Sequence, residues 1–353
     1  MTTVDVLSPT EAATPLRRSA WRPRALSATA RYIIRRVAFL LLTLWATITI
    51  NFFLPRAMPG NPAEAMMAKF HGRLNAAALH AMELAFGITN KSLWIQYVSY
   101  WSQLAHGNLG VSVNYFPASV SSLIGAALPW TLFLLGTSTI IAFVIGNVLG
   151  VIVAWRRGSM MDTVLTTTAM FTGAFPYFWL ALLVLFVLGF TLGWFPTSYA
   201  YSTGATPSFN ANFIGDAIAH AVLPGLTIVV TSIGGWLLTI RNNMLTVIHE
   251  DYVTLARAKG LSSSQVMFSY AGRNAMLPNV TAFGMAIGFV LSGTVLTEVV
   301  FSYPGLGSLL YGAVQSEDYA LLQGILLIVV TAVLIANLLA DVALLIIDPR
   351  LRG

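Results

Sequence analysis

The sequence, 353 residues long, contains no cysteine and few charged residues. Without a thiol the chain can form no disulfide, no thiolate metal site and no cysteine nucleophile, and cysteine content says nothing about its compartment. Asp, Glu, Lys and Arg make up only 9% of the residues, whereas 57% are hydrophobic. Soluble domains carry about 25% charged residues. So few charged side chains cannot cover a water-facing surface, and we therefore predict a membrane protein.

Motifs for nucleotide hydrolysis and for common hydrolases are missing as well. A phosphate-binding P-loop needs a lysine directly after a glycine, and none of the lysines follows one. His249 and Glu250 begin like the helix of a zinc protease, but Val253 stands where the second histidine is needed. There is no Gly-x-Ser-x-Gly, and no His or Cys lies within the long apolar segments. We do not expect the chain to be an enzyme or to bind a metal or cofactor itself.

Long apolar segments dominate what is present. Each is near or above the roughly 20 residues that cross about 30 Å of hydrocarbon. Because no water reaches the backbone amides there, each is expected to be a helix. We predict an all-α, polytopic protein in which residues 31–353 form a transmembrane domain and residues 1–30 a disordered cytoplasmic tail. The six predicted spans are 33–54, 130–155, 163–190, 221–240, 279–301 and 320–347.

The net charge of +6 lies beside the apolar segments. This distribution sets membrane topology and argues against a nucleic-acid partner. With a cytoplasmic N-terminus, fifteen of the 19 basic residues fall inside and four outside. The positive-inside rule then predicts that both termini are cytoplasmic. It also predicts an external loop at 55–129 and a cytoplasmic loop at 241–278.

The external segments carry their own signals. Within 55–129 we predict an amphipathic helix at 75–86, followed by aromatic residues at 94–101. Residues 191–220 contain several glycines and prolines that are typical of turns. In 302–319 a Pro-Gly turn is followed by a stretch that predicts a short helix at the membrane surface.

Glycine and proline are informative inside the predicted spans. Gly146 and Gly150 are four residues apart, as are Gly284 and Gly288, and small residues at this spacing let helices pack closely. The alternative is the ordinary frequency of glycine in membrane helices. Pro176 should kink its span, either as a hinge or as an accommodated bend.

Polar residues near the span ends have two interpretations. Glu298 lies near the external end of the fifth span, where it either contacts substrate or a gate, or caps the backbone turn at 302–305. Asp341, with Asn337 one turn earlier, and Asn147 are predicted to make polar contacts between helices. No acidic relay crosses the membrane, which argues against a proton-driven pump.

The loop at 251–278 combines small and basic residues. Ala256, Ala258 and Gly260 leave a thin surface that another protein can approach closely, and Arg257 and Lys259 give it charge. A spanning domain without an energy source of its own needs a place where a motor can bind. We predict that this loop is the docking site of a separate ATPase; the alternative is an ordinary basic cytoplasmic loop.

Together these motifs resemble the permease subunits of bacterial binding-protein-dependent ABC importers in the dipeptide, oligopeptide and nickel branch. They are most similar to the first of the two permeases, over about residues 31–353. Asn61, Asn108 and Ala320 depart from the family pattern, which has Asp, Asp and Pro there. The matching residues in the cytoplasmic loop are Tyr252, Ala256, Arg257, Ala258, Lys259, Gly260 and Leu261. Those near the last two spans include Glu298, Phe301, Pro304, Gly305, Gly307, Asp318, Tyr319, Gln323 and Gly324.

This resemblance implies a type I ABC importer permease fold in the bacterial inner membrane. It implies that the cytoplasmic loop holds a coupling helix that enters a groove on the ATPase. The expected partners are membrane lipid, a second similar permease, two ATP-binding subunits or one fused ATPase, and an extracytoplasmic substrate-binding protein. ATP and magnesium would be bound by the partners.

The implied substrates are di- or oligopeptides, with nickel chelates, oligosaccharides or other small solutes as alternatives. A channel without a motor and an intramembrane enzyme are the remaining function classes. The external gate or binding-protein contact would lie at Glu298, Pro304, Gly305, Gly307 and Asp318.

Overall fold

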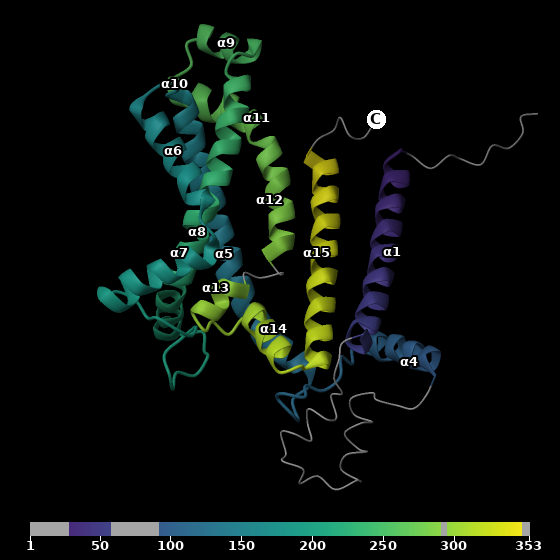
Figure 1. Ribbon diagram of the computed structural model, residues 1–353. Helices are drawn as coiled ribbons and strands as arrows, with labels where there is room; N and C mark the ends of the chain where they lie inside the picture. The colour runs from purple at the N-terminus through teal and green to yellow at the C-terminus, as the bar shows by residue number, and fades with distance from the viewer. Residues whose placement is uncertain (1–27, 58–91, 291–294, 348–353) are drawn as a thin grey trace, which may run out of the picture.

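The computed structural model describes residues 28–57, 92–290 and 295–347 (Figure 1). Nearly all of the predicted tail and the whole predicted helix at 75–86 lie outside the described residues. Where the chain is described, it is built of helices joined by turns, with a single isolated β-bridge between Val111 and Ser119. The prediction of an all-α protein is confirmed.

Four long helices carry apolar stretches of 21 to 37 residues, each long enough to cross a membrane. They correspond to the predicted spans 33–54, 130–155, 221–240 and 320–347. The helices are α1 (Ala28–Ala57), α5 (Val120–Trp155), α8 (Ala211–Val247) and α15 (Tyr319–Ile347).

Both α5 and α8 begin ten residues earlier than predicted. The reason lies in their caps. The Ser119 hydroxyl accepts a hydrogen bond from the Ser122 amide, and the Asn210 side chain accepts one from the Phe213 amide. These polar side chains satisfy free N–H groups of the first turn, so each helix starts there. Two prolines that fall inside the helices, Pro129 and Pro224, do not end them.

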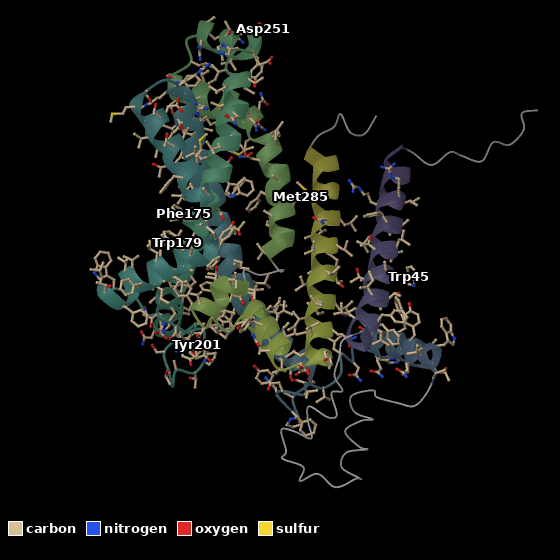
Figure 2. All side chains as sticks on the ribbon, viewed as in Figure 1. Trp45, Phe175, Trp179, Tyr201, Asp251 and Met285 are labelled. Atoms are coloured by element: carbon tan, nitrogen blue, oxygen red, sulfur yellow. The ribbon has the colours of Figure 1, made fainter. Side chains whose placement is uncertain are left out.

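The predicted span at 163–190 is broken in two. Helix α6 (Met160–Ala174) and helix α7 (Tyr177–Val184), which continues as the π-helix η1 (Leu185–Thr191), are bent by 101°. The break lies at Pro176, where the kink was predicted. Proline removes an N–H and forces Phe175 into an extended conformation with φ −79° and ψ 137°. Across the bend the rings of Phe175 and Trp179 stack, with centroids 4.7 Å apart (Figure 2).

The predicted fifth span, 279–301, is also divided. Helix α12 (Leu277–Val290) and helix α13 (Val295–Val300) flank residues that the structure does not describe. Helix α14 (Leu306–Gln315) follows the Pro-Gly turn, so the predicted short helix is present. Six membrane segments are thus consistent with the four long helices, the bent pair and α12.

Helices α5 and α8 pack side by side, with α6 against α8, α12 against α15 and α15 against α1 (Figure 1). Glycine allows the close contact between α5 and α8. A Cβ on Gly146 would lie 2.6 Å from the Trp236 Cβ, and one on Gly150 would lie 2.6 Å from the Leu237 carbonyl oxygen. Gly284 is half-buried on α12. The surroundings of Gly288 lie outside the described residues, so close packing at this pair stays a prediction.

A polar contact joins α5 to α12. The Asn279 side chain donates a hydrogen bond of 2.7 Å to the side-chain oxygen of Asn147, and Asn147 donates to the Phe143 carbonyl at 2.7 Å. This is the contact between helices that was predicted for Asn147. The side chain of Asp341 lies outside the described residues.

The molecule has two distinct ends (Figure 1). One end carries the start of α1, the end of α15 and the short helix α9 (Asp251–Ala258). The other carries α14 and helix α4 (Leu93–Ala105). The loop at 241–278 therefore lies at the same end as both chain termini of the helical body.

Candidate functional site

Helix α9 is set off from α8 by sharp boundaries. Glu250, extended at φ −70° and ψ 146°, precedes it, and Asp251 places a negative charge in its first turn, which favours the helix dipole. After Ala258 the chain turns at Gly260, whose φ is +76°. The Gly260 amide donates to the Arg257 carbonyl at 2.9 Å. The left-handed residue ends the helix, as expected for a glycine at this position.

One side of α9 is packed against the long helices. Val253 and Ala256 are buried, at 0% and 2% exposure, in an apolar cluster. Because the cluster includes residues from α5 and α8, α9 is packed against both helices. The other buried members are Val151, Ala154, Ile240, Met244, Val266, Ala271 and Ala275. We call residues 248–276, which this cluster holds, the hairpin.

The C-terminal end of α9 and the turn after it are open to the outside. Arg257, Ala258, Lys259 and Gly260 are exposed. Tyr252 and Leu261 are half-buried against the apolar cluster. The seven predicted docking residues therefore divide into one interior residue (Ala256), two partly buried ones and four that a partner can reach.

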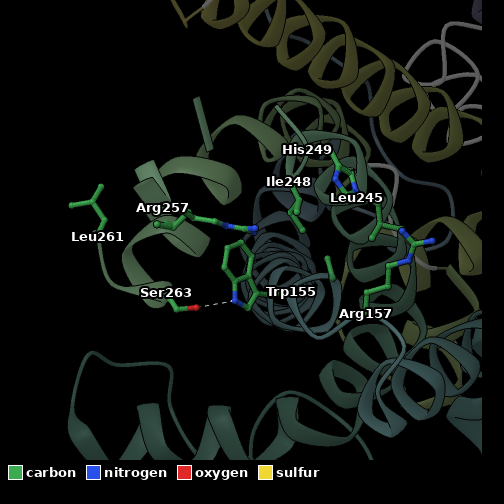
Figure 3. A pocket seen from close by; sticks show the side chains of 10 residues that line it. Trp155, Arg157, Leu245, Ile248, His249, Arg257, Leu261 and Ser263 are labelled. Atoms are coloured by element: carbon green, nitrogen blue, oxygen red, sulfur yellow. Dashed lines mark hydrogen bonds between the residues drawn. The ribbon is translucent and has the colours of Figure 1, made fainter. Parts of the chain in front are cut away.

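A pocket of about 500 Å³ lies between the hairpin and the ends of α5 and α8 (Figure 3). The guanidinium carbon of Arg257 stands 4.9 Å from the centre of the Trp155 ring, and the Trp155 indole donates a 3.0 Å hydrogen bond to the Ser263 hydroxyl. Arg157 and His249 also line the pocket, and no acidic side chain does. Chemically, the pocket suits an anionic or aromatic group.

An ion pair joins α6 to α8 near this end. The Arg241 Nε donates to Asp162 Oδ1 at 2.7 Å, and its second contact, from an Nη to Oδ2, measures 3.0 Å. Asp162 is buried and also accepts from the Gly158 amide at 3.0 Å. This bidentate pair fixes the turn after α5 against α8. Sequence reasoning missed it; the available signal was an acid and a base at the ends of two neighbouring spans.

At the other end, Glu298 is fully buried and its carboxylate is occupied internally. Oε1 accepts from the Thr131 hydroxyl at 3.0 Å, and Oε2 accepts from the amides of Gly307 at 2.7 Å and Ser308 at 3.1 Å. The Thr131 hydroxyl oxygen in turn accepts from the Leu306 amide at 2.7 Å. Of the two alternatives for Glu298, these are the contacts of a cap, placed at the start of α14 instead of at 302–305. We call this group the carboxylate clamp.

Two glycines make room for the clamp. A Cβ on Gly305 would lie 2.5 Å from both the Glu298 carboxyl carbon and the Thr131 hydroxyl, and one on Gly307 would lie 2.8 Å from the Val295 Cα. Both glycines are buried, and Pro304 is half-buried. The clamp thus depends on the Pro-Gly-x-Gly sequence that was singled out.

Asp318 is a second buried carboxylate, at the start of α15. One oxygen accepts from the Leu321 amide at 3.1 Å, which caps the helix. The other accepts from the Ser112 hydroxyl and from the Asn114 amide, the latter at 2.9 Å. Asp318 thereby ties the loop before α5 to the last helix.

A larger pocket of about 650 Å³ lies between α5, α6, α8 and α12. Its lining has no charged side chain and combines apolar groups with hydroxyls. The polar and aromatic members are Thr139, Tyr177, Thr231, Ser232 and Trp236. Among the described residues, no cluster of three or more His, Asp or Glu side chains has the arrangement of a metal site.

Comparison with known proteins gives the same family throughout. Residues 146–353 match the family described as "Binding-protein-dependent transport system inner membrane component". The oligopeptide transport system permease protein AppB of Bacillus subtilis is 35% identical over 324 residues, which cover 92% of this chain and 99% of the relative.

Two further relatives are similarly close. The di/tripeptide transport system permease protein DppB of Pseudomonas aeruginosa is 34% identical, over 91% of this chain and 98% of the relative. The dipeptide transport system permease protein DppB of Escherichia coli K12 is 32% identical over the same shares. With its apolar helices and a match over more than half its length, this multi-pass membrane chain belongs to the family of inner membrane components of binding-protein-dependent transport systems.

Proposed function

We propose that this chain is one of two permease subunits of an ATP-driven importer of di- or oligopeptides, and that its hairpin is the docking site of the ATPase. The observation that carries the proposal is the division of α9. Its buried side is packed onto α5 and α8, while Arg257 and Lys259 are exposed at its C-terminal end and Glu250 and Asp251 are exposed at its start. Such a helix can receive a displacement and pass it to the spans.

The proposed orientation follows from the two ends of the molecule. The hairpin and both termini of the helical body lie at one end (Figure 1), and the positive-inside rule assigns that end to the cytoplasm. The end with α14 would then face the extracytoplasmic substrate-binding protein. Two ATP-binding subunits, or one fused ATPase, would bind ATP and magnesium and dock below.

The transmission route is short. ATPase closure would move α9, the apolar cluster would carry the movement to α5 and α8, and the Asp162–Arg241 pair would extend it to α6. If these helices rocked as a rigid body, the translocation path would open alternately to the two sides of the membrane. At the external end, the carboxylate clamp would hold α14 to α5 as part of the gate.

Peptide as the substrate is supported by the relatives, whose names specify oligopeptide, di/tripeptide and dipeptide transport. The uncharged pocket between α5, α6, α8 and α12 suits half of the path, because its hydroxyls can bond peptide groups while its apolar walls accept varied side chains. Nickel chelates and oligosaccharides are the alternatives within the same architecture. Uptake competition between labelled dipeptide and these solutes separates them.

Gly260→Asp tests the coupling role. Aspartate tolerates positive φ better than most residues, and a Cβ at Gly260 meets nothing within 4 Å. The chain should therefore still fold and reach the membrane, while substrate-stimulated ATP turnover of the assembled transporter collapses. The matched control is Gly204→Asp, at φ +89° and equally free of neighbours, in the loop before α8. Unchanged uptake in Gly260→Asp, or equal loss in both variants, contradicts the assignment.

A further inference from the structure

Helix α4 (Leu93–Ala105) differs from every long helix of the chain. It runs across the end of α1 instead of alongside it (Figure 1), and none of its residues is buried. Its exposed residues include large apolar ones, with Trp94 at 71% exposure and Val98 at 51%. The helix contains no charged residue. An apolar surface of this kind at the end of a span needs a partner.

One side of α4 is fixed to α1. The Tyr97 hydroxyl is hydrogen-bonded to the Thr49 hydroxyl at 2.8 Å, and the Asn51 side chain donates to the Tyr100 hydroxyl at 3.4 Å. The Phe52 ring lies 5.2 Å from the Tyr97 ring and 5.7 Å from the Tyr100 ring, centre to centre. The orientation of α4 relative to α1 is therefore defined.

These contacts also set the depth of α4. The apolar part of α1 is Ile34–Leu54, 21 residues, which at 1.5 Å per residue spans about 30 Å, the thickness of the hydrocarbon core. Thr49 and Asn51 lie within its last two turns, roughly 5–8 Å from the end. Amphipathic helices in a bilayer interface lie at a depth of about 5–10 Å.

The side of α4 turned away from α1 carries two different stripes. Trp94, Val98 and Trp101 recur at helical spacing and form an apolar stripe, of which Trp101 is half-buried. Among the exposed polar residues, Ser99 and Gln103 lie one helical turn apart on the adjacent stripe, and Ser102 lies between the two stripes. The helix thus has a protein side, an apolar side and a water side, interrupted only by Ile95.

We propose that α4 lies in the bilayer interface, with Trp94 and Val98 directed into the acyl chains and Gln103 directed into water. Its partner is the lipid surface. Tryptophan and tyrosine favour this level of the bilayer because their rings are apolar and their N–H or O–H groups remain hydrated. Since α4 carries no charge, its immersion should not depend on anionic lipid. This proposal does not rest on the transported substrate or on ATPase docking.

The absence of native cysteine makes a direct test possible. Val98→Cys and Gln103→Cys, both at exposed positions of the same helix, are each labelled with a nitroxide in the full-length chain. The assembled transporter is reconstituted into phosphatidylcholine bilayers, with and without added phosphatidylglycerol. Collision of the nitroxide with oxygen, which concentrates in lipid, is compared with collision with a water-soluble nickel chelate.

We expect the label at 98 to favour oxygen several-fold over the chelate and the label at 103 to show the reverse, equally in both lipid mixtures. If both labels are open to the chelate, α4 lies in water and the proposal is wrong. If the label at 98 is shielded from both reagents, a protein covers the apolar stripe, and the proposal is equally wrong. If the preference of the label at 98 for oxygen required phosphatidylglycerol, α4 would be held by anionic lipid and not by its uncharged aromatic residues, and the proposal would be wrong.

Discussion

The hairpin and the carboxylate clamp lie at opposite ends of the molecule and use opposite chemistry. The hairpin has an apolar interior, with Val253 and Ala256 buried, and leaves Arg257 and Lys259 at its surface. The clamp has a charged interior, because the Glu298 carboxylate is fully buried and accepts hydrogen bonds from Thr131, Gly307 and Ser308.

This difference shows what a charge near the end of a span can do. At the clamp, the carboxylate is occupied by groups of its own chain, so its charge holds α14 in place and is hidden from any partner. At the hairpin, the cations remain accessible and the packing is left to alanine and valine. The two features therefore differ, although both contain charged residues near span ends. The clamp fixes the position of α14, whereas the hairpin leaves its basic side chains accessible.

The largest effect on stability is expected for Glu298→Ala. The substitution leaves the amides of Gly307 and Ser308 and the Thr131 hydroxyl without their acceptor in a buried place. Each unsatisfied buried donor costs about 1–3 kcal/mol, so the loss should reach about 3 kcal/mol or more. Thermal unfolding of the purified chain in detergent, followed by tryptophan fluorescence, measures it.

Glu298→Gln is the matched control, because it keeps one acceptor oxygen and nearly the same shape. It should lie between the wild-type chain and Glu298→Ala. An unfolding temperature of Glu298→Ala equal to that of the wild type would mean that the clamp does not hold α14, and the comparison between the two ends would fail.

A smaller effect, and a sharper comparison, is expected within α9 itself. Ala256 is 2% exposed among packed side chains, whereas Ala258 is exposed two residues later. Ala256→Leu overpacks the apolar cluster and should cost about 1–3 kcal/mol. Ala258→Leu should change stability by no more than about 0.5 kcal/mol, yet block docking by its bulk.

Thermal unfolding and co-purification with the ATPase subunits measure the two properties separately for this pair. Equal thermal stability of both variants would show that α9 does not have the two sides described. Full ATPase binding by Ala258→Leu would exclude its exposed side as the docking surface.

Much of the fold follows from local signals in the sequence. A long apolar segment predicts a span because the hydrocarbon core demands it, and Gly260 predicts the end of α9 because glycine adopts positive φ at little cost. The start of α5 was placed too late, since Ser119, the residue that caps it, lies outside the apolar segment.

Other features depend on neighbours that the sequence does not bring together. Pro176 predicts where the third span bends, but the 101° angle depends on how α6 and α7 each pack against α8. Asp162 and Arg241 are 79 residues apart, and only the fold makes them a pair. For Glu298 both alternatives were compatible with the sequence until its hydrogen-bond partners were placed.

Only a small effect on stability is expected for Arg257→Ala as well, and this variant separates the two ends most clearly. The guanidinium lies over the Trp155 ring at 4.9 Å, and a cation–π contact at an exposed site contributes only about 0.5–1 kcal/mol. If the exposed cation serves docking, this variant should unfold almost like the wild type and still lose ATPase binding, which is the reverse of Glu298→Ala. Arg257→Lys keeps the charge without the planar group, so it should retain binding that weakens with salt. Loss of binding in Arg257→Lys equal to that in Arg257→Ala would instead assign the role to the stacked guanidinium and to the shape that it gives the pocket beside Trp155.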